Sequence, residues 1–118
     1  MKNFVLFTAG LELLAGLILF AVPHLVPSLS SATAAGYTMA RMYGAAAFAI
    51  GFFALQVWRN FDSEDLKKAF LNTFVVFHIG VAVAIFIVNG SSGGAEELAP
   101  GVLHTVLAAI TIFYATRK

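Results

Sequence analysis

The sequence predicts an all-α membrane protein: one domain over residues 1–118, built as a bundle of four transmembrane helices. Hydrophobic residues make up 60% of the 118 residues and charged residues 11%, whereas soluble domains hold about 45–50% and about 25%. A soluble domain of this length could not bury so much apolar surface. The chain also contains four apolar segments close to the length that crosses about 30 Å of hydrocarbon as a helix. No ten-residue segment alternates apolar and polar residues as a barrel strand does.

The first helix is expected over residues 3–22, where an apolar run is followed by Pro23 and Pro27. The Ala32-x-Ala34 pattern downstream resembles a signal-peptide cleavage site. However, the apolar run is longer than the roughly 7–15 residues of a signal-peptide core. We therefore expect a retained first helix.

The second and third helices are expected over residues 35–58 and 64–88. The segment "SLSS" at residues 28–31 offers N-cap side chains for the second helix. Asp62 or Ser63 in "NFDSED" offers an N-cap for the third helix, since short oxygen-bearing side chains accept hydrogen bonds from the first free N–H groups of a helix. Both helices therefore have a start signal.

The fourth helix is expected over residues 98–116. It follows "NGSSGG" at residues 89–94, whose composition predicts a flexible turn. Pro100 suits the first turn of this helix, where its missing N–H removes no hydrogen bond.

The basic residues predict the orientation. They flank the N terminus, the second loop and the C terminus: Lys2, Arg59, Lys67, Lys68, Arg117 and Lys118. The first and third loops contain no Lys or Arg, and the third contains Glu96 and Glu97. By the positive-inside rule, both termini are expected to face the cytoplasm.

Helical spacing places small and polar residues together on three helices. These faces comprise Thr8, Ala9, Glu12, Ala15 and Gly16; Ala40, Gly44, Ala47, Gly51 and Ala54; and Gly101, His104, Ala108, Thr111 and Ala115. Small residues allow membrane helices to approach closely. These faces are therefore expected to point inward, and the Phe, Leu and Ile side chains outward.

Glu12 lies near the middle of the first helix, where a carboxylate costs roughly 2.5–3.5 kcal/mol on insertion scales. Arg41 is its natural counter-charge, because it is the basic residue inside the apolar segments, which run over residues 3–22, 35–58, 69–88 and 100–115. Their α-carbons are expected to differ in depth by on the order of 10 Å. Direct or water-mediated pairing is one hypothesis. The other is that Arg41 extends to the outer head groups while Glu12 is protonated.

His78 is expected near the membrane midplane and His104 closer to the outer surface, where His24 also lies. This depth difference argues against bis-histidine haem ligation. His78 could hydrogen-bond Glu12, relay a proton or bond a helix carbonyl.

The sequence shows no metal-ligand spacing and no nucleophile motif. It has no Cys, which excludes disulfides and thiolate metal sites. We therefore expect no catalytic residue, metal or cofactor, and candidate binding residues at Glu12, Arg41, His78, His104 and Tyr37. The net charge of +1 gives no sign of the basic surface that nucleic-acid binding requires, so we expect no nucleic-acid partner.

The stretch "LELLAGLILF" followed by "ARMYGAAAFAIGFFAL" resembles small four-helix bacterial membrane proteins of the broad DoxX-like type. In that pattern a helix-1 Glu precedes an Arg-x-x-Gly segment, and the matching positions are Glu12, Arg41 and Gly44. The resemblance implies a four-helix fold in the bacterial inner membrane. Some DoxX-like proteins are associated with respiratory or redox complexes.

The architecture also resembles the small multidrug-resistance transporters, in which a helix-1 Glu exchanges protons for cations. Glu12 would be that residue. The sequence departs from this family because its third helix lacks the expected Gly- and Trp-containing segment, and because Arg41 would repel a cation.

Two functions are therefore expected as alternatives. The first is a non-enzymatic accessory or interaction subunit of a larger membrane assembly, with membrane lipids and other membrane proteins or further copies of the chain as partners. The second is binding of a lipid, quinone or carboxylate, or proton-coupled transport by a small transporter, with Glu12 and Arg41 as the working residues.

Overall fold

A computed structural model describes residues 1–89 and 94–117, apart from the side chains of residues 96 and 97. Within these ranges the chain forms four long α-helices and no strand, which confirms the all-α prediction. The centre of the predicted "NGSSGG" turn, at residues 90–93, and Lys118 lie outside the described residues.

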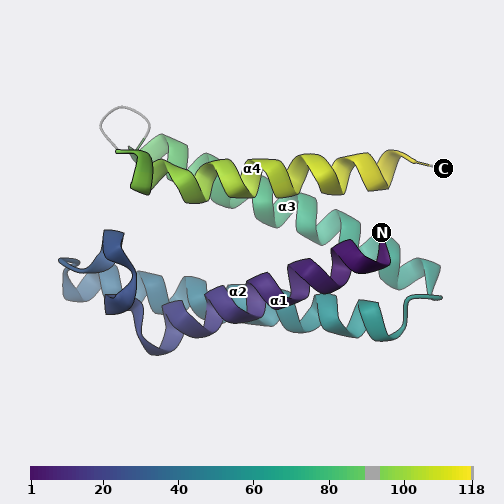
Figure 1. The fold of residues 1–118 in the computed structure, drawn as a ribbon, viewed down its shortest axis with the longest axis horizontal. Helices are drawn as coiled ribbons and strands as arrows, with labels where there is room; N and C mark the ends of the chain where they lie inside the picture. The colour runs from purple at the N-terminus through teal and green to yellow at the C-terminus, as the bar shows by residue number, and fades with distance from the viewer. Residues whose placement is uncertain (90–93, 118) are drawn as a thin grey trace. The chain divides into compact units, whose positions relative to one another are not determined.

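The four helices are α1 (Lys2–Ala21), α2 (Ala34–Arg59), α3 (Glu64–Asn89) and α4 (Ala95–Thr116). All four are long and apolar enough to cross a membrane. Two single-turn 3-10 helices, η1 (Pro23–Leu25) and η2 (Pro27–Leu29), join α1 to α2. The chain divides into two compact units, residues 1–63 and 64–118. Each is an antiparallel helix pair (Figure 1) and is described by itself.

Proline and threonine set the boundaries between α1 and α2. Pro23 and Pro27 each open a 3-10 turn, where a residue without an N–H group sacrifices no hydrogen bond. The N-cap of α2 is Thr33, whose Oγ1 accepts a hydrogen bond from the Gly36 N–H at 3.2 Å. The prediction of a cap within "SLSS" was wrong. The Ser30 hydroxyl instead donates to the Pro27 carbonyl at 2.9 Å and stabilises η2.

Glycine allows α1 and α2 to pack backbone against backbone. A Cβ placed on Gly16 would lie 2.7 Å from the Gly44 carbonyl oxygen, and one on Gly44 would lie 2.8 Å from the Gly16 carbonyl oxygen. A Cβ on Gly51 would lie 2.6 Å from the Leu13 nitrogen. All five small residues predicted to line α2 are buried, which confirms that face. On α1, Ala15 of the predicted face is only half-buried.

Buried aromatic rings distinguish the second unit from the first. Phe70 and Phe74 of α3 are fully buried, with ring centroids 4.1 Å apart. The prediction that phenylalanine side chains face outward was therefore wrong for these two. It holds for Phe7, Phe20 and Phe52, which are more than half exposed.

The start of α4 also differs from the prediction. The helix begins at Ala95, so Pro100 lies inside it rather than in its first turn. Proline in a helix interior removes one backbone hydrogen bond, a loss that membrane helices tolerate where neighbouring groups re-satisfy the backbone. The next residue, Gly101, packs closely on α3: a Cβ there would lie 3.0 Å from Ile85 Cγ2. On the same face of α4, Ala115 is exposed.

Candidate functional site

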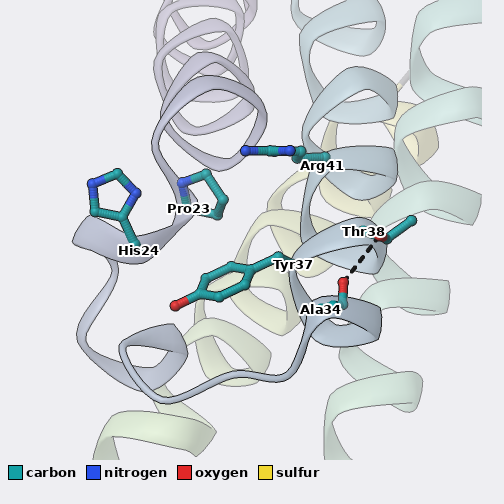
Figure 2. Close-up of a pocket in the computed structure, with 6 residues that line it drawn as sticks. All are labelled: Pro23, His24, Ala34, Tyr37, Thr38 and Arg41. Atoms are coloured by element: carbon teal, nitrogen blue, oxygen red, sulfur yellow. Dashed lines mark hydrogen bonds between the residues drawn. The ribbon is translucent and has the colours of Figure 1, made fainter.

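A cavity of about 420 Å³ opens at the end of the first unit where α1 gives way to α2. We name it the Arg41 cavity. Its lining consists of Pro23, His24, Ala34, Tyr37, Thr38 and Arg41. Arg41 and Tyr37 extend from α2 toward the segment that carries Pro23 and His24 (Figure 2). The cavity therefore combines a cationic group, hydroxyl groups and apolar surface.

Local sequence positions each side chain of this cavity. Tyr37 and Arg41 are four residues apart in α2 and so share one helix face. The Tyr37 hydroxyl donates to the Ser30 carbonyl at 3.3 Å, which ties the loop to the helix. The Thr38 hydroxyl donates to the Ala34 carbonyl at 3.0 Å. The Tyr37 hydrogen bond thus fixes the loop against α2, whereas the Thr38 hydrogen bond stays within α2.

The Arg41 side chain is exposed to the cavity. Within the described residues, no hydrogen bond or ion pair engages its guanidinium. A guanidinium presents five N–H donors in a planar fork that matches carboxylate and phosphate oxygens. The Arg41 cavity is therefore chemically suited to an anionic group.

Glu12 is 3% exposed on α1 and does not line the Arg41 cavity. It lies about one turn before Gly16, and Arg41 lies about one turn before Gly44. Gly16 and Gly44 meet in an antiparallel helix pair. Glu12 and Arg41 therefore lie on opposite sides of that contact along the helix axes. The two α-carbons are therefore separated by on the order of 10 Å along the helix axes. No ion pair joins Arg41 to Glu12 in the part of the chain that the structure describes.

The second unit contains a buried histidine pair. His78 of α3 is 0% exposed and His104 of α4 is 7% exposed. Their Nδ1 atoms are 2.7 Å apart, which is hydrogen-bond distance, and their ring centroids are 5.0 Å apart. The rings of Phe74 and Phe77 contact the His78 ring edge-on, and Phe77 also contacts His104. The pair thus lies in an aromatic environment.

This contact corrects the prediction that the two histidines lie at different depths. His78 is 11 residues before the end of α3, and His104 is 9 residues after the start of α4. At 1.5 Å per residue these offsets differ by only about 3 Å. The error arose because the start of α4 was placed three residues too late.

The depth argument against bis-histidine haem ligation therefore falls with that prediction.

The structure brings together two pairs of the five predicted binding residues. Arg41 and Tyr37 share the cavity, His78 and His104 form the pair, and Glu12 is buried on α1. Sequence reasoning missed the contribution of Pro23 and Thr38 to the cavity, although the i, i+4 spacing of Tyr37 and Arg41 was visible. It also missed the aromatic contacts of Phe74 and Phe77.

Comparisons with protein-family models, with curated proteins and with solved structures found no match to this chain. The similarities to DoxX-like proteins and to small multidrug-resistance transporters therefore stay predictions from sequence.

Proposed function

We propose that this chain is an integral membrane protein that binds the anionic head group of a membrane-soluble molecule in the Arg41 cavity. The observation that carries the proposal is the Arg41 guanidinium, which lines the cavity while no hydrogen bond or ion pair within the described residues occupies it. The proposal involves binding and no chemical reaction.

The position of Arg41 favours a ligand with an apolar tail. Arg41 lies in the first third of a 26-residue helix that is long and apolar enough to cross a membrane. In a membrane, that position is close to the boundary between hydrocarbon and head groups. A carboxylate or phosphate at this boundary could accept hydrogen bonds from Arg41, while its tail remained among lipid chains.

The other lining residues would define the shape of the head group. Pro23 is fully buried and forms an apolar wall. Tyr37 and His24 carry polar groups on the same lining. A hydrogen bond to a charged group contributes about 1.5–3 kcal/mol, so the loss of Arg41 should weaken binding by about 10- to 100-fold.

The experiment measures binding to the full-length protein in a phosphate-free, non-ionic detergent. The probes are short-chain phosphatidylglycerol, octanoate and inorganic phosphate. We expect the first two to bind and the Arg41→Gln variant to lose that binding about 10- to 100-fold. If inorganic phosphate bound tightly and the other two probes did not, the ligand would be a free anion, and the proposal of a membrane-soluble ligand would fail.

Arg59 provides the matched control, because it is an exposed arginine at the opposite end of the same helix. Arg59→Gln should leave the affinity unchanged. Equal losses in Arg41→Gln and Arg59→Gln would mean that binding follows general charge, and the proposal would fail.

The orientation of the cavity follows from the basic residues, and we propose that both termini face the cytoplasm. Lys2 lies 5.8 Å from the ring centroids of Trp58 and Phe61. A basic and aromatic cluster thus occupies the end of the first unit away from the cavity, as the positive-inside rule requires of a cytoplasmic end. The Arg41 cavity would then face the periplasm of a bacterial cell.

An accessory role in a larger membrane assembly is the other function predicted from sequence. Its support is the large apolar side chains that are exposed on all four helices, for example Val76 at 73% and Ile87 at 76%. Lipid would cover these surfaces equally well. Purification in mild detergent decides between the two: constant stoichiometry with another membrane protein would favour the accessory role.

A further inference from the structure

The buried histidine pair of the second unit has a property that the anion-binding proposal does not use. Two imidazole nitrogens 2.7 Å apart must share a proton or another cation, because two facing lone pairs would repel. In the neutral pair, one Nδ1 carries the proton and the other accepts it. A metal ion can take the place of that proton once both rings adopt the Nε2–H tautomer.

We propose that His78 and His104 form a two-imidazole site for a transition-metal cation, with Cu²⁺ as the preferred ion. Imidazole nitrogen suits copper, nickel and zinc, whereas magnesium and calcium prefer oxygen ligands. The pair therefore selects a class of metal by its donor atoms alone.

Within that class, the general affinity order of divalent metals places copper above zinc. The observed Nδ1 separation is 2.7 Å, close to the spacing of about 2.8 Å between neighbouring ligands of an ion with bonds of about 2.0 Å. In the hydrogen bond the two nitrogens point at each other, so the rings must tilt before both lone pairs point at one ion.

Aromatic rings surround the pair. Phe74 and Phe77 pack edge-on against His78 with centroid distances of 5.0 and 5.3 Å, which restricts rotation of that ring.

The alternative is that the pair is a structural hydrogen bond with no affinity for metal. The chain offers a direct way to distinguish the two, because it contains three histidines and the third, His24, is exposed in η1. In the His24→Gln variant, any imidazole bound to a metal must belong to the pair. This variant should fold normally, because the replaced residue is exposed. Its paramagnetic signal therefore tests the pair while both buried histidines are still present.

The experiment adds one equivalent of Cu²⁺ to the full-length, untagged His24→Gln protein in detergent and records pulsed electron paramagnetic resonance. We expect coupling to the nitrogens of two imidazoles and a stoichiometry of one ion per chain. Copper that shows no imidazole coupling, or no bound copper at all, would overturn the proposal.

Competition titrations give the second measurement. His78→Gln and His104→Gln, each in the His24→Gln background, should weaken Cu²⁺ binding at least about 10-fold, and Zn²⁺ should bind the parent variant more weakly than Cu²⁺. Unchanged copper affinity in both variants would contradict the assignment. Where a variant does not fold, the spectrum of the His24→Gln protein decides.

Discussion

Replacement of Gly44 by alanine should separate α1 from α2, although it adds only one methyl group. The new Cβ would lie 2.6 Å from the Phe20 nitrogen, 2.8 Å from the Gly16 oxygen and 2.9 Å from the Leu19 carbonyl carbon. All three are backbone atoms, so no side-chain rotation can relieve the contact. An ordinary contact begins at 3.4 Å, and the helices must therefore move apart by about 0.8 Å, with loss of close packing along their length.

The expected cost follows from two opposing effects. Inserting one methylene-sized group into a well-packed interior costs about 1–3 kcal/mol, and the backbone contact places Gly44 at the upper end of this range. Alanine gains about 1 kcal/mol over glycine in helix propensity. We therefore expect Gly44→Ala to lower the free energy of unfolding by about 2 kcal/mol. Gly44→Leu and Gly51→Leu should lower it further.

Gly10 and Gly80 are the matched controls, because a Cβ on either would meet no atom within 4 Å. Gly10→Ala and Gly80→Ala should raise stability by up to about 1 kcal/mol. The free energies are measured by unfolding in mixed micelles of sodium dodecyl sulfate and a non-ionic detergent. If Gly44→Ala were as stable as Gly10→Ala, the close packing of α1 on α2 would be refuted.

Three further predictions concern the cap, the buried carboxylate and the orientation. Thr33→Ala should destabilise the protein by about 1 kcal/mol because it removes the N-cap of α2, whereas Ser31→Ala should change stability little; equal effects would contradict the cap assignment. Glu12→Gln and Arg41→Gln should be additive within about 0.5 kcal/mol in a double-mutant cycle, because no ion pair joins these residues in the part described; a coupling above about 1 kcal/mol would restore the pair. A reporter fused after residue 118 should be active only in a cytoplasmic assay, and periplasmic activity would reverse the proposed orientation.

Local sequence patterns were enough to predict the four helices and the small-residue face of α2. Both depend on local properties: the length of each apolar run, the proline residues after α1, and the spacing of Gly44, Ala47 and Gly51 along one helix face. The first three helices begin and end within one residue of their predicted bounds. Such features need no knowledge of which helix packs against which.

Which polar residues meet depends on how the helices pack, and local patterns do not reveal it. The His78–His104 contact depends on the starting point of α4, and a shift of three residues along a helix changes depth by about 4.5 Å. The Arg41 cavity depends on η1, which carries Pro23 and His24 to the first turns of α2. Composition could not distinguish inward-facing from outward-facing phenylalanines, because a ring in the interior and a ring in lipid are both in apolar surroundings. The side that each ring takes is set by the neighbouring helix.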